Sequence, residues 1–83
     1  MLERLNTQRK VVGIKQLRRA LREGQIEAVF AALDADPHLT EPLQAECGRV
    51  GAELIWVSSM AELGKACGIS VGASAAGLLA EAE

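Results

Sequence analysis

The chain has little of what most active sites are built from: among its 83 residues are two aromatic residues, one histidine and two cysteines. With Phe30 and Trp56 as its aromatic residues, the sequence offers little for stacking single-stranded bases or for an aromatic cage. Cys47 and Cys67 lie in apolar surroundings without a CxxC pair, so they make a poor metal site. We read them as buried free thiols, which fits a reducing cytoplasm.

Long hydrophobic runs are also missing. Residues 1–10 have no apolar stretch of the kind found in a secretory signal. The most apolar segment, Val71–Ala80, is far shorter than the ~20 residues that a membrane span needs. We therefore expect a cytoplasmic protein without a membrane partner.

Candidate catalytic residues do not cluster at a recognisable spacing. Asp34 and Asp36 form a carboxylate pair that could serve a metal or acid–base role, but turn and capping roles explain them more simply. His38 beside a proline is typical of a surface turn. Ser58 and Ser59 precede an apolar run and are candidate helix caps. The sequence predicts a protein that is not an enzyme and has no cofactor and no metal.

The net charge of −2 hides an uneven distribution. Residues 1–24 contain seven bases and two acids, a net charge of +5, whereas residues 25–83 contain two bases and nine acids, a net charge of −7. Such asymmetry indicates an anionic partner on one face of the molecule. A solvated basic helix face explains the charge pattern equally well.

Strand-like and helix-like patterns alternate along the chain. The apolar spacing and the turn residues predict helices at 2–7, 15–22, 40–51 and 59–68, and strands at 10–12, 26–33, 54–57 and 71–79. Thr40 or Asp36 can cap the third helix, and a start near Thr40 is favoured because Pro42 then lies in its first turn. We read Gly68 as a helix stop and Gly72 as a turn residue. The order predicts an α/β fold: one three-layer α/β/α domain over residues 1–83, with a largely parallel or mixed central sheet.

The junction between the first strand and the next helix carries the most chemistry. Gly13 ends the strand, so the first amides of the helix point outward without partners and attract phosphates or other acceptors. Lys15 and Gln16 stand at this tip, where long donors can reach base edges. Arg18, Arg19 and Arg22 follow on the polar face and can contact phosphates.

Three segments together resemble a known family. They are Gly13–Leu21 (GIKQLRRAL), Asp34–Pro37 (DADP) and Leu63–Gly72 (LGKACGISVG), in this order and spacing. The sequence is similar over about residues 5 to 80 to the ribosomal protein L7Ae/L30e family, and most of all to its small bacterial YbxF-type branch.

This resemblance implies a four-stranded mixed sheet in a three-layer sandwich. It also implies binding to kink-turn RNA, a bent duplex with tandem sheared G·A pairs and a bulge whose nucleotide is flipped out. The wider family's helix-tip motif, Gly-x-Asn-Glu-x-x-Lys, falls on Gly13, Lys15, Gln16 and Arg19, so Lys15 and Gln16 replace Asn and Glu. The loop that covers the flipped nucleotide falls on residues 68–71, with Lys65 able to reach a phosphate.

We therefore expect a monomer that binds structured RNA, with ribosomal RNA, the ribosome or a riboswitch as candidate partners. The predicted RNA-binding residues are Gly13, Ile14, Lys15, Gln16, Arg18, Arg19, Arg22, Lys65, Gly68, Ile69, Ser70 and Val71. The alternative is a protein–protein adaptor, or a structural ribonucleoprotein subunit, on the same fold without kink-turn specificity.

Overall fold

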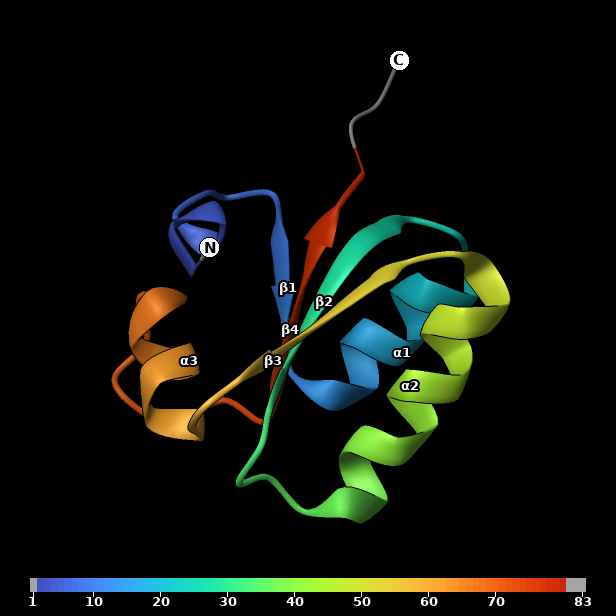
Figure 1. The fold of residues 1–83 in the computed structure, drawn as a ribbon. Helices are drawn as coiled ribbons and strands as arrows, with labels where there is room; N and C mark the ends of the chain where they lie inside the picture. Colours follow the sequence, from blue (N-terminus) through green and yellow to red (C-terminus); the bar gives the residue numbers. More distant parts are fainter. Residues whose placement is uncertain (1, 81–83) are drawn as a thin grey trace.

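The structure is a computed structural model that describes residues 2–80. A short 3-10 helix precedes three α-helices and four strands, which alternate along the chain (Figure 1). The elements are η1 (Leu2–Leu5), β1 (Lys10–Val12), α1 (Ile14–Arg22), β2 (Ile26–Ala32), α2 (Pro37–Val50), β3 (Glu53–Val57), α3 (Met60–Ala66) and β4 (Ala75–Leu79). Among these described residues, none of the helices combines the length and apolarity needed to cross a membrane.

The four strands form one sheet in the order β1-β4-β2-β3. β2 and β3 run parallel, whereas β4 pairs antiparallel with both β1 and β2. The predicted α/β fold with a four-stranded mixed sheet is thus confirmed. β4, the last strand among the described residues, lies inside the sheet between the edge strand β1 and the parallel pair of β2 and β3.

Helices cover both faces of this sheet, which gives the predicted three layers (Figure 1). On one face, α1 and α2 pack over a core that includes Leu17, Leu21 and Leu43. On the other face, α3 and η1 pack over Phe30 and Leu63. A chain of this length has room for only a thin core on each side of the sheet, because small domains bury a limited share of their surface.

Small residues in β4 let the helices approach closely. A Cβ on Gly77 would collide with the Cδ1 atom of Leu17 on α1 and would lie 3.1 Å from the Cδ1 atom of Ile26. Leu17 is fully buried at this contact. The absence of a side chain at Gly77 therefore sets the depth at which α1 sits on the sheet, and with it the position of the N-terminus of α1.

The predicted start of the third helix was wrong. α2 begins at Pro37, with Asp36 as its N-cap, and the Asp36 carboxylate accepts a hydrogen bond of 2.9 Å from the backbone amide of His38. A proline fits the first helical position because its missing N–H would have no partner there. Pro42 lies inside the helix, and the helix continues without the hydrogen bond that an amide at that position would donate.

The last strand was also predicted too long. β4 begins at Ala75, and the preceding residues 71–74 belong to the loop that follows α3. Val71 is 69% exposed, so its apolar character does not mark a buried strand residue. Similarly, β2 ends at Ala32 and leaves Leu33 in the turn. Both strands were predicted too long because apolar residues continue in the sequence beyond the ends of the strands.

Candidate functional site

The N-terminus of α1 presents free amides, as the sequence predicted. Gly13 is the N-cap, with φ of 109°, and donates its own amide to the carbonyl of Ala75 at 3.3 Å. The first helical bond runs from the Leu17 amide to the Gly13 carbonyl at 3.0 Å, and no side chain caps the helix. Within the described residues, the amides of residues 14–16 therefore have no backbone or side-chain acceptor, and an anion or a base edge can use them.

The charged side chains of α1 lie on two sides of the helix. Lys15, Arg18 and Arg22 border a hollow of about 360 Å³, together with Ile14 and Leu39. On the other side, Gln16 and Arg19 line a second hollow of about 260 Å³ that extends to Gln25. Arg19 is 3.7 Å from Glu23 in an exposed ion pair, which costs little to open because such pairs are weak.

Arg18 has a structural partner that the sequence did not reveal. Its Nε atom donates to Glu46 on α2 at 2.9 Å, and the Glu46 side chain is only 8% exposed. Arg49 approaches the same carboxylate at 3.7 Å. Arg18 thus joins α1 to α2, while its other guanidinium nitrogens remain available at the surface, where the side chain is 39% exposed.

The loop between α3 and β4 is held against α3 by its backbone. The amide of Ile69 donates to the carbonyl of Gly64 at 3.1 Å, and the amide of Ala73 donates to the carbonyl of Met60 at 3.0 Å. A Cβ on Gly64 would lie 3.0 Å from the carbonyl carbon of Val71 and closer still to its oxygen. Gly64 is therefore a close-approach position. α3 ends at Ala66 with Cys67 as its C-cap, two residues before the predicted end, and Gly68 follows the cap with φ of 78°.

This loop displays apolar side chains to solvent. Ile69 is 38% exposed and Val71 is 69% exposed, with Ser70 exposed between them. Lys65, on the last turn of α3, is exposed beside the loop. Exposed aliphatic side chains on a backbone fixed by hydrogen bonds can cover a flat apolar group without large rearrangement.

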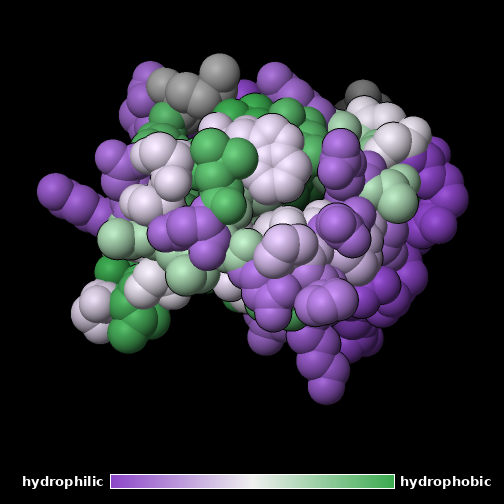
Figure 2. Space-filling view, turned by 60° about the horizontal axis from the view of Figure 1, so that its bottom comes forward, coloured by the Kyte–Doolittle hydropathy of each residue, from purple (hydrophilic) through white to green (hydrophobic). Residues whose placement is uncertain are grey.

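The α1 N-terminus and this loop lie at the same end of the sheet (Figure 1). β4 joins the two segments. The Gly13 amide donates a hydrogen bond to the Ala75 carbonyl, and Val12 of β1 pairs with Ala76 of β4. Figure 2 brings this end forward and shows apolar patches among hydrophilic groups. All the predicted site residues are exposed or partly exposed, so the fold leaves them accessible to one partner.

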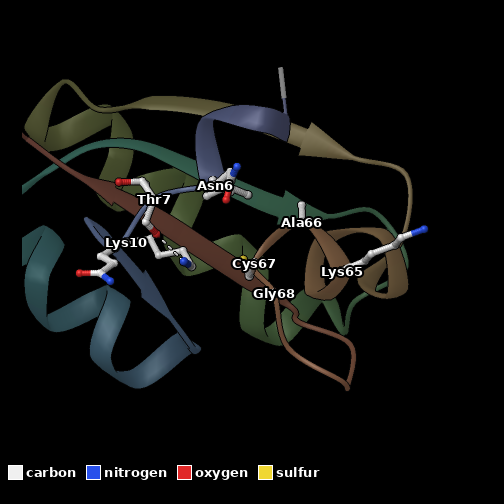
Figure 3. Close-up of a pocket in the computed structure, with 9 residues that line it drawn as sticks. Asn6, Thr7, Lys10, Lys65, Ala66, Cys67 and Gly68 are labelled. Atoms are coloured by element: carbon white, nitrogen blue, oxygen red, sulfur yellow. Dashed lines mark hydrogen bonds between the residues drawn. The ribbon is translucent and has the colours of Figure 1, made fainter.

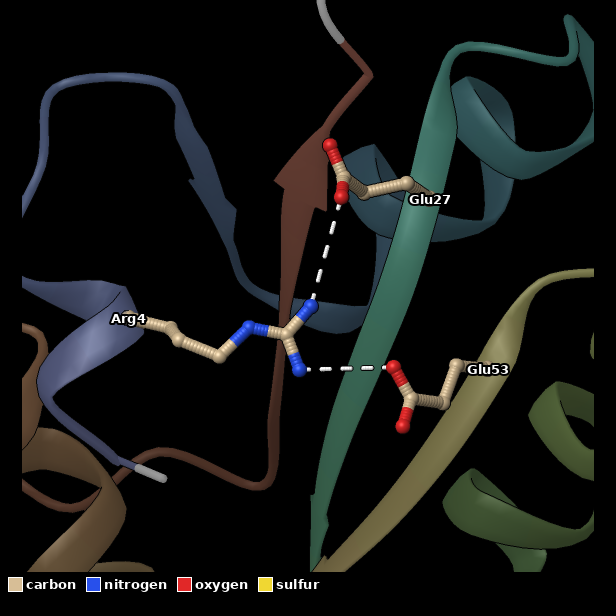
Figure 4. A network of polar contacts seen from close by, with 3 residues as sticks. All are labelled: Arg4, Glu27 and Glu53. Atoms are coloured by element: carbon tan, nitrogen blue, oxygen red, sulfur yellow. Dashed lines mark hydrogen bonds and ion pairs between the residues drawn. The ribbon is translucent and has the colours of Figure 1, made fainter.

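The positive charge of the N-terminal segment is divided between the two faces of the sheet. Arg4 lies on the η1 side, where it approaches Glu53 at 3.3 Å and Glu27 at 4.0 Å (Figure 4). Its guanidinium carbon also lies 5.8 Å from the centre of the Phe30 ring. The basic segment of the sequence is therefore not one patch. The charge on the candidate surface comes mainly from α1.

The residues considered for catalysis have structural partners. Asp34 accepts a 2.8 Å hydrogen bond from the amide of Met60, and the Ser59 hydroxyl accepts one of 3.1 Å from the amide of Glu62. Ser58 is hydrogen-bonded to the Glu62 carboxylate. Among the residues described, no three or more His, Cys, Asp or Glu side chains come together to hold a metal.

Both cysteines are free and buried. Burial raises the pKa of the Cys47 thiol, and the nearby Glu46 carboxylate raises it further. Burial also raises the pKa of the Cys67 thiol, against an opposing effect of Lys10. The thiols are therefore protonated at neutral pH, which fits their interpretation as packing residues.

One hollow was not anticipated from the sequence. It has a volume of about 510 Å³ and lies between residues 5–10 and the end of α3 (Figure 3). Its position next to Gly68 places it beside the α3–β4 loop. No motif marks it, because its lining comes from two segments more than fifty positions apart.

Comparisons with known proteins agree with this arrangement. The family model described as "Ribosomal protein L7Ae/L30e/S12e/Gadd45 family" matches residues 2–83. The RNA-binding protein YbxF of Geobacillus stearothermophilus is 44% identical over 69 residues, which cover 83% of this chain and 84% of that protein. An RNA-binding protein of Bacillus pumilus (strain SAFR-032) is 39% identical over 69 residues, again 83% and 84% of the two chains.

Solved structures show the same fold. The Giardia lamblia 15.5kD RNA binding protein superposes with a TM-score of 0.87 at 26% identity, covering 96% of this chain and 68% of that one. A protein of unknown function from Bacillus halodurans C superposes with a TM-score of 0.83 at 25% identity, covering 93% and 81%.

Proposed function

This chain belongs to the ribosomal protein L7Ae/L30e/S12e/Gadd45 family, and we propose that it is a non-enzymatic RNA-binding protein that recognises kink-turn RNA. Residues 1–83 act as one binding domain, as a monomer in the cytoplasm. Relatives named as RNA-binding proteins match most of the chain. The target is a structured RNA, with ribosomal RNA or a riboswitch as candidates.

The main support for this proposal is that a polar surface and an apolar surface lie together at one end of the sheet. The first is the N-terminus of α1, with free amides and the long donors of Lys15 and Gln16. The second is the apolar loop with Ile69 and Val71 exposed. A straight duplex offers base edges and phosphates but no flipped base, so only a bent RNA engages both surfaces at once.

The chemistry of each surface decides which part of the RNA it contacts. The α1 amides and Lys15 contact base edges in the kinked region, and Arg19 and Arg22 neutralise phosphates on either side. Ile69 and Val71 cover the flipped nucleotide in place of the aromatic stacking that this sequence lacks. Because the protein binds the bent form better than the extended one, it shifts the RNA towards the bent form.

A gel-shift titration against a kink-turn RNA and a straight duplex of equal length, at two salt concentrations, tests this function. We expect tighter binding to the kink-turn, with a preference that persists when salt weakens both affinities. Equal affinity for the two RNAs with equal salt sensitivity would mean that the protein binds RNA only as a nonspecific polycation. Binding to neither would favour the protein–protein adaptor and contradict the proposal.

Substitutions at the α1 tip test the assignment of the surface. Lys15→Ala and Arg19→Ala should each weaken kink-turn binding by about 1–3 kcal/mol if the side chain makes a specific contact. Arg9→Ala is the matched control, because it removes an exposed positive charge before β1, at the opposite end of that strand from Gly13. Unchanged affinity in the Lys15 and Arg19 double variant would remove α1 from the binding surface.

A further inference from the structure

The hollow beside α3 has the features of a small-molecule site. Its volume of about 510 Å³ lies within the range of about 300–1,000 Å³ that is usual for ligand pockets. Asn6, Thr7 and Lys10 gather on one side of it and Cys67 and Gly68 lie on the other, whereas the ammonium group of Lys65 points away (Figure 3). Leu5 and Ala66 add apolar wall.

The charge in this hollow is not neutralised. The Lys10 side chain is partly buried, and its ammonium group donates to the Thr7 carbonyl. No carboxylate among residues 2–80 pairs with it. A lysine ammonium has three N–H donors, so Lys10 has donors left for an anion. Its positive charge also acts on the Cys67 thiol across the hollow.

Two polar side chains without partners among the described residues line the same hollow as Lys10. The side chains of Asn6 and Gln8 line the hollow and make no hydrogen bond within the described part of the chain. A carboxamide offers a donor and an acceptor side by side, which is the pattern that pairs with the edge of a nucleobase. The groups of the hollow match the parts of a nucleotide: the cation suits a phosphate, and the carboxamides and the apolar wall suit a base.

We propose that this hollow is a nucleotide-binding site, with the phosphate on Lys10 and the base between Asn6, Gln8 and the wall formed by Leu5 and Ala66. It adjoins the surface proposed for the kink-turn and shares Lys65 and Gly68 with it. Two sources supply the same chemistry: a free mononucleotide, or a nucleotide of an RNA strand that continues past the α3–β4 loop. The second source rests on the proposed kink-turn function, and the first does not.

The test is a titration of the isotope-labelled protein with adenosine 5′-monophosphate, with inorganic phosphate and adenosine as partial ligands. We expect amide shifts confined to residues 5–10 and 65–68. Lys10→Gln should weaken binding of the monophosphate about tenfold or more, since hydrogen bonds to charged groups contribute that much. Arg49→Gln is the control, because it removes an equal charge on α2, on the other face of the sheet.

Asn6→Ala gives a second, independent variant. Its exposed side chain has no hydrogen-bond partner among residues 2–80, so the loss of nucleotide affinity is separable from any loss of stability. If both variants keep the affinity of the wild type, or if the shifts fall on α1 instead, the proposed site is wrong. The proposed site is also wrong if none of the three probes produces a shift and a single-stranded extension of the RNA adds no affinity.

Kink-turn RNA with and without a short single-stranded extension distinguishes the two sources. An extension that tightens binding to the wild type but not to the Lys10→Gln variant identifies the RNA strand as the ligand. Nucleotide binding without any gain from the extension identifies the free nucleotide. A wild-type protein that binds the kink-turn, binds no nucleotide and gains nothing from the extension disproves this inference alone. Nucleotide binding without kink-turn binding disproves the proposed function alone.

Discussion

Replacing Gly64 by alanine tests how the apolar loop is positioned. In most helices this change is stabilising, because alanine exceeds glycine in helix propensity by about 1 kcal/mol. Here the new Cβ would lie 3.0 Å from the carbonyl carbon of Val71 and 3.1 Å from the Cα of Gly72, and closest of all to the Val71 carbonyl oxygen. These neighbours are backbone atoms, so no side chain can rotate to make room.

The loop must therefore move away from α3, and the cost follows from the bonds it loses. The amides of Ile69 and Ala73 donate to carbonyls of α3 at 3.1 and 3.0 Å, and each such bond contributes about 1 kcal/mol. Crowding adds a further 1–3 kcal/mol, roughly what overpacking costs elsewhere. Set against the gain in helix propensity, we expect a net loss of about 2–4 kcal/mol in the free energy of unfolding.

Urea denaturation measures this loss, and Gly48→Ala provides the matched control. Gly48 lies within α2, is exposed, and has no atom within 4 Å of a built Cβ, so its replacement should stabilise the protein by roughly 0.5–1 kcal/mol. Gly64→Ala should also weaken kink-turn binding about tenfold, because the displaced loop no longer forms one binding surface with the α1 tip. If both variants are stabilised alike and bind RNA like the wild type, the reasoning about the loop is refuted.

Three further outcomes are expected. Arg18→Ala should lower the free energy of unfolding by about 1–2 kcal/mol in thermal melts, because the buried Glu46 carboxylate loses its 2.9 Å partner; an unchanged melting temperature would show that this pair adds nothing. Ile69→Asp should weaken kink-turn binding about tenfold in gel shifts while stability stays near that of the wild type, since the side chain is 38% exposed; unfolding of this variant would make Ile69 a core residue. Folding raises the pKa of the Cys47 and Cys67 thiols above their ordinary value of 9.0. Their contribution to stability should therefore be complete below that pH and be lost as the pH rises through the raised values. Alanine at both positions should flatten this alkaline decrease in the free energy of unfolding, as measured by denaturant titrations.

The fold followed from the sequence where local pattern and packing agree. Continuous apolar runs marked β2 and β3, and Ser59 and Gly68 marked the ends of α3. The antiparallel insertion of β4 between β1 and β2 was not contained in the alternation of strands and helices, which is compatible with a largely parallel sheet. The family resemblance implied a mixed sheet of four strands, but it did not give the place of β4 within that sheet.

The predicted start of α2 and the predicted length of β4 were wrong because a specific local contact outweighed a general residue preference. Pro42 suggested a late helix start, but Pro37 after Asp36 is the better first turn and the helix tolerates the second proline. Val71 extended the predicted β4, whereas backbone bonds to α3 keep this residue in a loop. Neither competing contact is visible in the apolar periodicity of the chain.

The candidate surface was predictable only in its local parts. Gly13 and the residues after it form a helix tip in sequence order, so their chemistry could be inferred directly. The partner of Arg18 lies 28 positions away, and the hollow around Lys10 is closed by the end of α3. Such long-range pairings depend on the packed structure and leave no motif in one sequence.

Mapping of amide chemical shifts on binding a kink-turn RNA tests the central claim most directly. If the α1 tip and the α3–β4 loop form one surface, the largest changes will fall on residues 13–22 and 65–71, and β3 and the C-terminal half of α2 will change little. Large changes on β3, or changes confined to only one of the two segments, would contradict the account.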